Sequence, residues 1–392
     1  MSDAHAGGAF AVREQSAYGL GSSFAGIAAG GSLSSIFWNP ANLVDVRRLE
    51  IEAVGTGFLP SVDVKVDAQP QLGFPGSNEG NVASDVFLPA AYAAYRLNHR
   101  IVLGVGVNSP YGLNTKYDGD SILNQTGIAG KTEVVSVNLN PVLGVEVTDW
   151  LALAVGAQVQ YFDATFTRQA LGPLGVSKLQ GDDVGFGFTA GVKVTPLPGT
   201  EFGLGYRSFI DHDLDGTLKT PNAGNFDVHY KGVSLPDMLT LGLRQKVTDR
   251  IRVMAGAEWS NWSRFGTVKV KGGPAPIELP FQYEDSWFFS GGGEVDVTEQ
   301  VTLRAGIGYQ QSPIGDNVRT YRLPYNHGLY FSGGASYRLD ERFSFDIGYS
   351  YVTVEDMDIR AADAGGPAAN GPFSGHADVH VHYISAAIKA RF

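Results

Sequence analysis

The segment VTLRAGIGYQ, Val301–Gln310, alternates strictly between apolar residues and polar or small residues. In an extended strand one face would carry Val301, Leu303, Ala305, Ile307 and Tyr309, and the other face Thr302, Arg304, Gly306, Gly308 and Gln310. About ten residues of such alternation match the length of a tilted strand that crosses a membrane. The stretches 151–162 and 343–351 repeat the pattern. The segment therefore predicts one strand of a membrane barrel, although a large soluble β-sandwich could mimic any single strand.

The connections between such segments separate these two architectures. We expect about fourteen antiparallel strands, at 49–58, 84–97, 100–108, 131–147, 150–167, 182–194, 201–210, 234–247, 250–265, 283–297, 300–311, 328–339, 342–354 and 379–392. The joins after even-numbered strands are tight, at 98–99, 148–149, 195–200, 248–249, 298–299 and 340–341. Joins after odd-numbered strands are long and polar, including 60–83, 109–130, 211–233 and 355–378. This sorting of short and long joins is typical of an outer-membrane barrel, whereas a sandwich has no reason for it.

Bulk composition is consistent with one exported all-β unit. The 392 residues contain no linker or charge block that would divide them. The lack of cysteine excludes disulfides, thiolate metal sites and cysteine catalysis. A net charge of −11 without a basic stripe argues against nucleic acid as a partner. Because no apolar run approaches the roughly 20 residues of a spanning helix, a helical membrane protein is excluded.

The N-terminal region reads differently from the rest of the chain. The run YGLGSSFAGIAAGG, 18–31, has too many glycines for a stable helix and too little alternation for a strand. It leads into SSIFWNPANL, 34–43, where Pro40 holds Asn39 extended and Ala41 follows. Compact irregular backbone needs an enclosure to satisfy its amides. We therefore expect residues 1–47 to form a plug, or hatch, inside a barrel of residues 48–392, although Asn39-Pro40-Ala41 alone also fits an ordinary turn.

The two ends of the chain carry further signals. The last strand ends in Phe392, as in the signal that outer-membrane barrel insertion machinery reads. No complete signal peptide is present, but Ala4-His5-Ala6 has the small-x-small form of a cleavage site. We therefore expect the precursor's hydrophobic leader to be missing from this chain.

Several motifs together resemble the FadL family of outer-membrane transporters for hydrophobic compounds. They are GGAF (7–10), YGLGSSFAGIAA (18–29), FWNPANL (37–43), GVNSPYGL (106–113), GYRS (205–208) and LRAGIGYQQSPIGDNVRTYRLP (303–324). The resemblance runs essentially end to end and implies a fourteen-stranded barrel closed by an N-terminal hatch. It implies a monomeric, non-enzymatic channel of the Gram-negative outer membrane without cofactor or metal. Its partners would be a hydrophobic small molecule, outer-membrane lipid and lipopolysaccharide, and the barrel-assembly machinery.

The third expected strand contains a candidate lateral opening. Pro110 removes a ladder donor and Gly106 weakens pairing, so a bulge or kink is expected around Asn108 and Ser109. In the family that this chain resembles, the third strand kinks inward and leaves a gap in the wall. The alternative is that Pro110 only ends the strand and begins a loop.

Aromatic and aliphatic residues of the expected hatch are candidates for an apolar ligand pocket. They are Phe10, Leu20, Phe24, Phe37 and Trp38. The resemblance implies that movement of residues 7–10 releases the ligand. The alternative for each of these side chains is simple packing in the core of the hatch.

Three arginines are candidate contacts for a ligand carboxylate, because guanidinium binds carboxylate through two hydrogen bonds. Arg304 lies on the polar face of its strand, and Arg319 and Arg322 lie near the expected outer rim. Inward arginines also balance inward acids such as Asp346. Passive uptake of long-chain fatty acids is the favoured function, and uptake of aromatic hydrocarbons by the same route is the alternative. The outer joins, notably 168–181, are shorter than expected for the fatty-acid branch.

Three other functions are disfavoured. His376, Asp378, His380 and His382 share a strand face, but same-face neighbours stand nearly 7 Å apart, too far to share one ion easily. An outer-membrane hydrolase would need a nucleophile beside the 211–213 triplet Asp-His-Asp, and the sequence has no G-x-S-x-G. A general porin has no reason to carry a Gly/Ala-rich plug.

Overall fold

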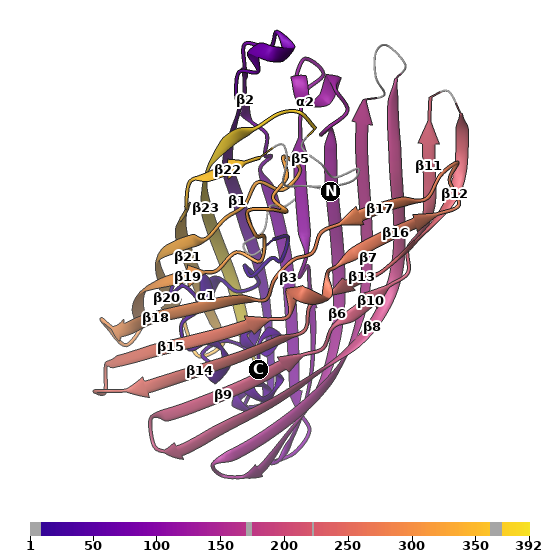
Figure 1. Ribbon diagram of the computed structural model, residues 1–392. Helices are drawn as coiled ribbons and strands as arrows, with labels where there is room; N and C mark the ends of the chain where they lie inside the picture. The colour runs from indigo at the N-terminus through magenta and orange to yellow at the C-terminus, as the bar shows by residue number, and fades with distance from the viewer. Residues whose placement is uncertain (1–8, 170–174, 222, 361–370) are drawn as a thin grey trace.

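The wall of the protein is a closed antiparallel β-barrel (Figure 1). The computed structural model describes residues 9–169, 175–221, 223–360 and 371–392. Within these residues fourteen wall strands are paired, and β1 closes the barrel by pairing with both β3 and β23. The wall strands are β1 (Leu49–Val66), β3 (Val86–Arg96), β4 (Ile101–Asn108) continued by β5 (Gly112–Lys116), β6 (Lys131–Thr148), β7 (Leu151–Gln169), β8 (Val176–Leu197), β9 (Thr200–Arg207), β14 (Met238–Lys246), β15 (Ile251–Ser260), β18 (Ser286–Asp296), β19 (Val301–Gln310), β20 (Gly328–Arg338), β21 (Phe343–Val354) and β23 (Gly375–Arg391). The predicted fold class is confirmed.

Pairing continues beyond the predicted strand ends on the side of the long joins. The join expected at 168–181 is largely a hairpin, because β7 and β8 pair out to Gln169 and Val176. The other long joins contain β2 (Ser77–Asn81), β10 (Ile210–His212), β11 (Asp215–Thr220), β12 (Gly224–Lys231), β13 (Val233–Leu235), β16 (Thr267–Lys271), β17 (Ile277–Pro280), β22 (Met357–Ile359), α2 (Ile122–Gln125), η4 (Pro70–Leu72) and η5 (Trp262–Arg264). These segments satisfy their backbone amides by pairing with one another and with wall strands, so they form a folded roof.

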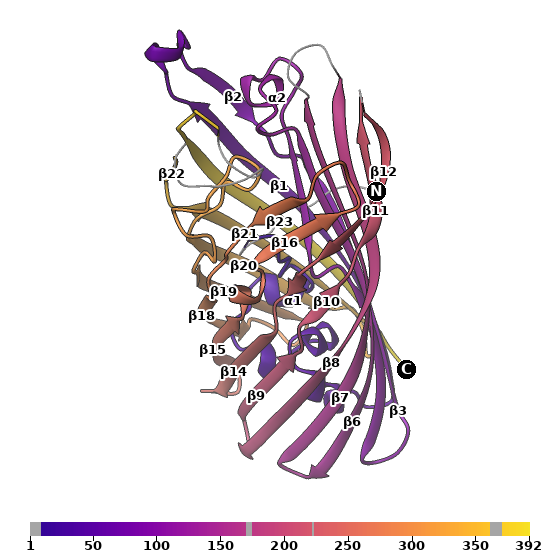
Figure 2. The same cartoon turned by 45° about the vertical axis from the view of Figure 1, so that its right-hand side comes forward.

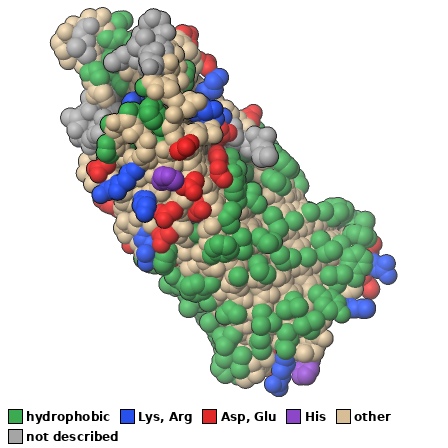
Figure 3. Space-filling view, turned by 90° about the vertical axis from the view of Figure 1, so that its right-hand side faces the viewer, with side chains coloured by type: hydrophobic (Ala, Val, Ile, Leu, Met, Phe, Trp, Pro, Cys, Tyr) green, Lys and Arg blue, Asp and Glu red, His purple; other side chains and the backbone are tan. Residues whose placement is uncertain are grey.

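The outer face of the wall is apolar, as the alternation predicts. On β19 the outward Leu303 and Ile307 are 45% and 63% exposed, whereas the inward Arg304 is 5% exposed. Figure 3 shows hydrophobic side chains gathered in a broad band, with charged side chains toward the two ends of the barrel. In the described part of the chain, no helix is long and apolar enough to cross a membrane.

The hatch lies inside the barrel as irregular backbone with four short helices (Figure 2). These helices are α1 (Ala17–Leu20), η1 (Ile27–Ala29), η2 (Leu33–Phe37) and η3 (Pro40–Asp45). Inward glycines of the wall make room for hatch backbone. A Cβ on Gly203 would collide with Ala28 O, and a Cβ on Gly205 would collide with Trp38 O. The small members of the polar strand faces are therefore docking sites for the hatch.

Candidate ligand pocket and lateral opening

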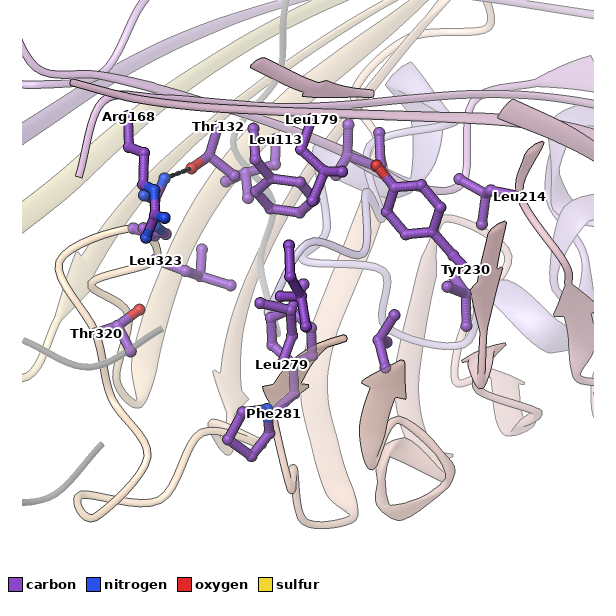
Figure 4. A pocket seen from close by; sticks show the side chains of 18 of the residues that line it. Leu113, Thr132, Arg168, Leu179, Leu214, Tyr230, Leu279, Phe281, Thr320 and Leu323 are labelled. Atoms are coloured by element: carbon purple, nitrogen blue, oxygen red, sulfur yellow. Dashed lines mark hydrogen bonds between the residues drawn. The ribbon is translucent and has the colours of Figure 1, made fainter. Parts of the chain in front are cut away.

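An apolar pocket of about 310 Å³ lies under the roof of the barrel. Strands of the wall supply one side of it, and roof strands supply the other. Figure 4 shows side chains from both sides turned toward a common space, among them Leu113, Leu179, Leu214, Tyr230, Leu279 and Leu323. The apolar lining can remove a bound hydrocarbon from water. Each methylene buried there stabilises the bound hydrocarbon by about 0.8 kcal/mol.

Phe10 of the hatch forms part of the lining of this pocket. Its ring lies 4.9 Å from the ring of Trp262 and 5.2 Å from that of Phe265, both edge-on, and 5.9 Å from that of Tyr111. Of the five hatch residues predicted to line a ligand pocket, Phe10 alone lines this one. Among the described residues, this pocket under the roof, the outer pocket, therefore meets the hatch at a single aromatic side chain.

The four other predicted pocket residues lie in the packed hatch. Trp38 contacts the rings of Phe24 and Phe37 at centroid distances of 5.4 and 4.9 Å, and Leu20 is fully buried. Phe37 and Trp38 also line a second cavity of about 20 Å³ beside Pro110. The structure thus joins Phe37 and Trp38 to the third wall strand, and leaves Leu20 and Phe24 as hatch packing.

Two arginines face the outer pocket. Arg322 donates from Nη1 to Thr132 Oγ1 and to Thr167 O, each at 3.3 Å, and Arg168 lines the same pocket. Burial, together with the charge of Arg168, lowers the pKa of the Arg322 guanidinium to about 10. Among the described residues neither arginine forms an ion pair with a carboxylate. Sequence reasoning named Arg322 but missed Arg168, because it placed Arg168 in a loop.

The two other predicted arginines hold the fold together. Arg319 donates to Asp316 at 2.8 Å and to Tyr325 O at 3.1 Å. Arg304 lies on the opposite side of the hatch, with nitrogens 3.8 Å from Glu294 and 3.5 Å from Asp346. Neither guanidinium lines the outer pocket.

The Asn39-Pro40-Ala41 motif anchors the hatch to the wall. Asn39 Oδ1 accepts from Ala41 N at 3.0 Å and caps η3, with Pro40 as its first residue. Asn39 Nδ2 donates to Ala28 O at 2.7 Å and to Val192 O of β8 at 3.0 Å. The motif is therefore more than a turn, because one side chain ties two hatch segments to a wall strand.

The third wall strand bulges at residues 109–111. Asn108 pairs with Asn138 and Gly112 pairs with Val135, so three residues of this strand oppose two of β6. On its other edge the strand leaves β3 after the pair Ala91 and Val107. Among the described residues, 86–90 of β3 pair only with β1, and the next contact is a bridge from Ala83 to Thr115. The ladder between β3 and the third strand is therefore interrupted.

The predicted opening residues fall on both sides of this bulge. Asn108 ends β4, and Ser109 and Pro110 form the bulge itself. Gly106 lies in the regular ladder below it, where its lack of a side chain leaves room for the ring of Tyr92. The bulge thus begins at Ser109 and does not involve Gly106.

The hatch supplies the partners that the bulge has lost. Val12 N donates to Pro110 O at 2.8 Å, and Gly112 N donates to Phe10 O at 2.9 Å. Gln15 donates from Nε2 to Ser109 O at 2.8 Å. The segment that carries Phe10 therefore acts as a short strand against the kink. Movement of this segment would change the outer pocket and the opening together.

Below the hatch lies a charged vestibule of about 830 Å³. Tyr18 of the hatch donates to Glu294 at 2.9 Å. The guanidinium carbon of Arg304 lies 4.1 Å from the centre of the Tyr18 ring. Glu294 also accepts from Arg244 at 2.9 Å. The underside of the hatch is thus clamped by ion pairs, in contrast to the apolar pocket above.

The histidines considered for metal binding and for hydrolysis contact other side chains. His382 Nδ1 lies 2.8 Å from Tyr349 Oη, and no group of three or more His, Cys, Asp or Glu side chains in the described ranges is placed to hold a metal ion. His212 is buried between Asp183 at 3.0 Å and Gln160 at 3.2 Å. The expected cleavage motif at 4–6, and residues 7 and 8 of the expected gate, lie outside the described residues.

Glu14 should make the hatch less stable as the pH rises. Both its carboxylate oxygens are buried without a hydrogen-bond partner among the described residues. Burial raises the pKa of Glu14 from 4.5 to about 7, although the charge of Arg13 opposes this. Since the folded hatch favours the protonated form, its stability should fall by about 3 kcal/mol as the pH rises from about 4.5 to about 7.

Hydrogen exchange of residues 9–24 across this pH range, corrected for the intrinsic rates, measures the effect. Glu14→Gln should abolish the pH dependence, and Glu278→Gln on an exposed roof strand should leave it unchanged. An unchanged dependence in Glu14→Gln would assign it to another group.

Comparison with known proteins agrees with this geometry. The family model described as "Outer membrane protein transport protein (OMPP1/FadL/TodX)" matches residues 1–392. The long-chain fatty acid transport protein of Escherichia coli O6:H1 is 25% identical over 388 residues, which cover 88% of this chain and 86% of that protein.

Two solved structures share the fold. A Pseudomonas aeruginosa FadL homologue superposes with a TM-score of 0.87 at 20% identity, covering 98% of this chain and 100% of the homologue. The P. putida toluene transporter TodX gives a TM-score of 0.72 at 16% identity, covering 92% and 94%. The end-to-end family match shows that the chain belongs to the OMPP1/FadL/TodX family, and that it is a non-enzymatic transporter of hydrophobic compounds in the Gram-negative outer membrane.

Proposed function

We propose that this transporter takes up long-chain fatty acids passively. The observation that carries the proposal is the pair Arg168 and Arg322 at the edge of a large apolar pocket. An amphiphile with a carboxylate head and a hydrocarbon tail complements both parts of this site, because guanidinium binds carboxylate bidentately and the pocket removes the tail from water. The ligand would enter from the extracellular roof and pass Phe10.

Uptake of aromatic hydrocarbons is the second candidate. The aromatic cluster of Phe10, Tyr111, Trp262 and Phe265 supports it, since rings of this kind pack edge-on against a small aromatic ligand. Such a ligand makes no use of Arg168 and Arg322. The two candidates therefore differ in whether the arginines contribute to affinity.

We propose a lateral exit through the interruption between β3 and the third wall strand. Release downward would carry a hydrocarbon past the ion pairs of Arg304, Glu294 and Arg244 into a water-accessible vestibule, at a cost of about 0.8 kcal/mol per exposed methylene. Release sideways returns the chain directly to lipid. Contact of the apolar band with outer-membrane lipid and lipopolysaccharide, insertion by the barrel-assembly machinery, and a monomeric state belong to the same proposal.

Replacing both pocket arginines should separate the two ligand classes. In Arg168→Gln/Arg322→Gln the affinity for oleate should fall about tenfold to a hundredfold, because a charge-assisted pair contributes about 1.5 to 3 kcal/mol. Toluene binding should stay within about twofold. Quenching of tryptophan fluorescence measures both ligands, since Trp262 contacts Phe10 at the pocket.

Arg342→Gln, an exposed residue of a tight turn, is the control for general loss of positive charge. If the unmodified protein binds toluene and not oleate, or if the double variant binds oleate normally, the fatty-acid proposal fails.

A further inference from the structure

Arg207 is a buried cation that makes no hydrogen bond among the described residues. It is the last residue of β9, and its side chain is 5% exposed inside the barrel. Nε, Nη1 and Nη2 all lack a hydrogen-bond partner among the described residues. Arg13, Arg244 and Arg304 also have an Nε without a hydrogen-bond partner, but their other nitrogens donate to acidic or polar groups. Leaving a whole guanidinium unpaired in the interior is costly, so this position calls for an explanation.

The groups around Arg207 leave it available to an anion. Its guanidinium carbon lies 4.4 Å from the ring centre of Phe37. The acid that acts on it electrostatically is Glu258, but Arg13 donates to one oxygen of that carboxylate at 2.7 Å and Thr240 donates to the other at 3.0 Å. Among the described residues Glu258 makes no hydrogen bond with Arg207, so it is not the missing partner.

Arg207 also lies near residues that border the interruption in the wall. They are Tyr111, in the bulge of the third strand, and Tyr92 of β3, in the paired ladder just below the interruption. Tyr92 Oη donates to Gln15 O, and Gln15 in turn binds Ser109. Met238, the β14 neighbour of Arg207, lines the small cavity beside Pro110. A cation here therefore lies along a path from the outer pocket to the lateral opening.

We propose that Arg207 is an inner binding site for the carboxylate of a long-chain amphiphile. When the Phe10–Val12 segment leaves the bulge, the head group would pass from Arg168 and Arg322 to Arg207 while the tail reaches the interruption beside β3. The fork of three unpaired nitrogens matches a carboxylate, and Phe37 supports the planar group from one side. This site rests on the proposed function, because it takes the same ligand class.

Transfer of oleate and of oleyl alcohol into proteoliposomes tests this site, since the two chains differ only in the head group. In Arg207→Gln we expect oleate transfer to slow at least about tenfold while oleyl alcohol transfer stays within about twofold. The oleate concentration at half-maximal quenching of tryptophan fluorescence should stay unchanged, since the outer pocket is intact. Arg207→Lys should keep part of the oleate rate because it keeps the charge. Arg342→Gln should behave like the unmodified protein.

The outcomes separate the two proposals. Equal slowing of both chains in Arg207→Gln would assign Arg207 to structure and overturn the inner site, as would normal oleate transfer. If Arg207→Gln fails to form a heat-modifiable barrel, Arg207→Lys takes its place in the test. The ratio of its oleate and oleyl alcohol transfer rates is then judged by the same criteria. If the unmodified protein transfers oleyl alcohol and not oleate, the proposed fatty-acid function is contradicted. The inner site then fails as well, because it rests on that function.

Discussion

Straightening the third wall strand should reduce oleate uptake to the level of cells that lack the protein. The change is Ser109→Thr together with Pro110→Val, which restores a backbone donor and two β-branched side chains at the bulge. Residues 109–111 could then extend the ladder toward the unpaired edge of β3 at 86–90. A closed ladder would leave no lateral exit, and the charged vestibule offers a hydrocarbon no favourable alternative. Uptake of labelled oleate by whole cells measures the effect.

Pro141→Val is the matched control for this change. Pro141 faces lipid on β6 and pairs with Val105 below the bulge, so its replacement leaves the interruption unchanged. Binding to the outer pocket should persist in the straightened variant, because Phe10, Arg168 and Arg322 are retained. Continued uptake by a variant with a closed ladder would show that the exit leads to the periplasm.

The sequence predicted the wall better than the roof. Strand number and the sorting of joins followed from alternation, because a strand between lipid and lumen must change polarity at every residue. The roof strands were missed because they have no lipid face, and their pairing depends on partners far away in the chain. The 168–181 join is the clearest case, since β7 and β8 continue there as a paired hairpin.

The candidate site was predicted only in part, for the same reason. Ser109 and Pro110 mark the bulge by local chemistry, and Pro89 is a second local signal in the sequence. Proline favours an unpaired strand edge, and Pro89 lies in the stretch of β3 that pairs only with β1. The sequence does not identify Arg207 as a candidate binding residue, because it does not show whether an inward arginine forms a pair with a carboxylate. Only the structure shows that the neighbouring Glu258 is already engaged.

Placing a side chain at Gly205 should open the barrel without unfolding it. Gly205 sits in a regular part of β9, paired with Gly191 and Thr240, so the strand itself accepts Gly205→Val. Its Cβ, however, would occupy the position of Trp38 O. Overpacking against backbone costs about 1 to 3 kcal/mol or more, and neither the wall nor the capped η3 turn can move aside easily. The hatch should therefore lose its docked position.

The measurable result is a pore. Liposomes that carry Gly205→Val should swell in small sugars, whereas those with the unmodified protein should not, and hydrogen exchange of residues 16–45 should rise. Gly333→Val is the matched control, because a Cβ at Gly333 meets nothing within 4 Å and the strand pairing is equally regular. If Gly205→Val folds and stays closed to sugars, the hatch must be held by more than its fit against the wall glycines. The contacts that remain to hold it are then those of Tyr18 with Glu294 and its ion pairs, because they do not depend on space at Gly205, whereas a Cβ there would lie 2.8 Å from Asn39 Cα.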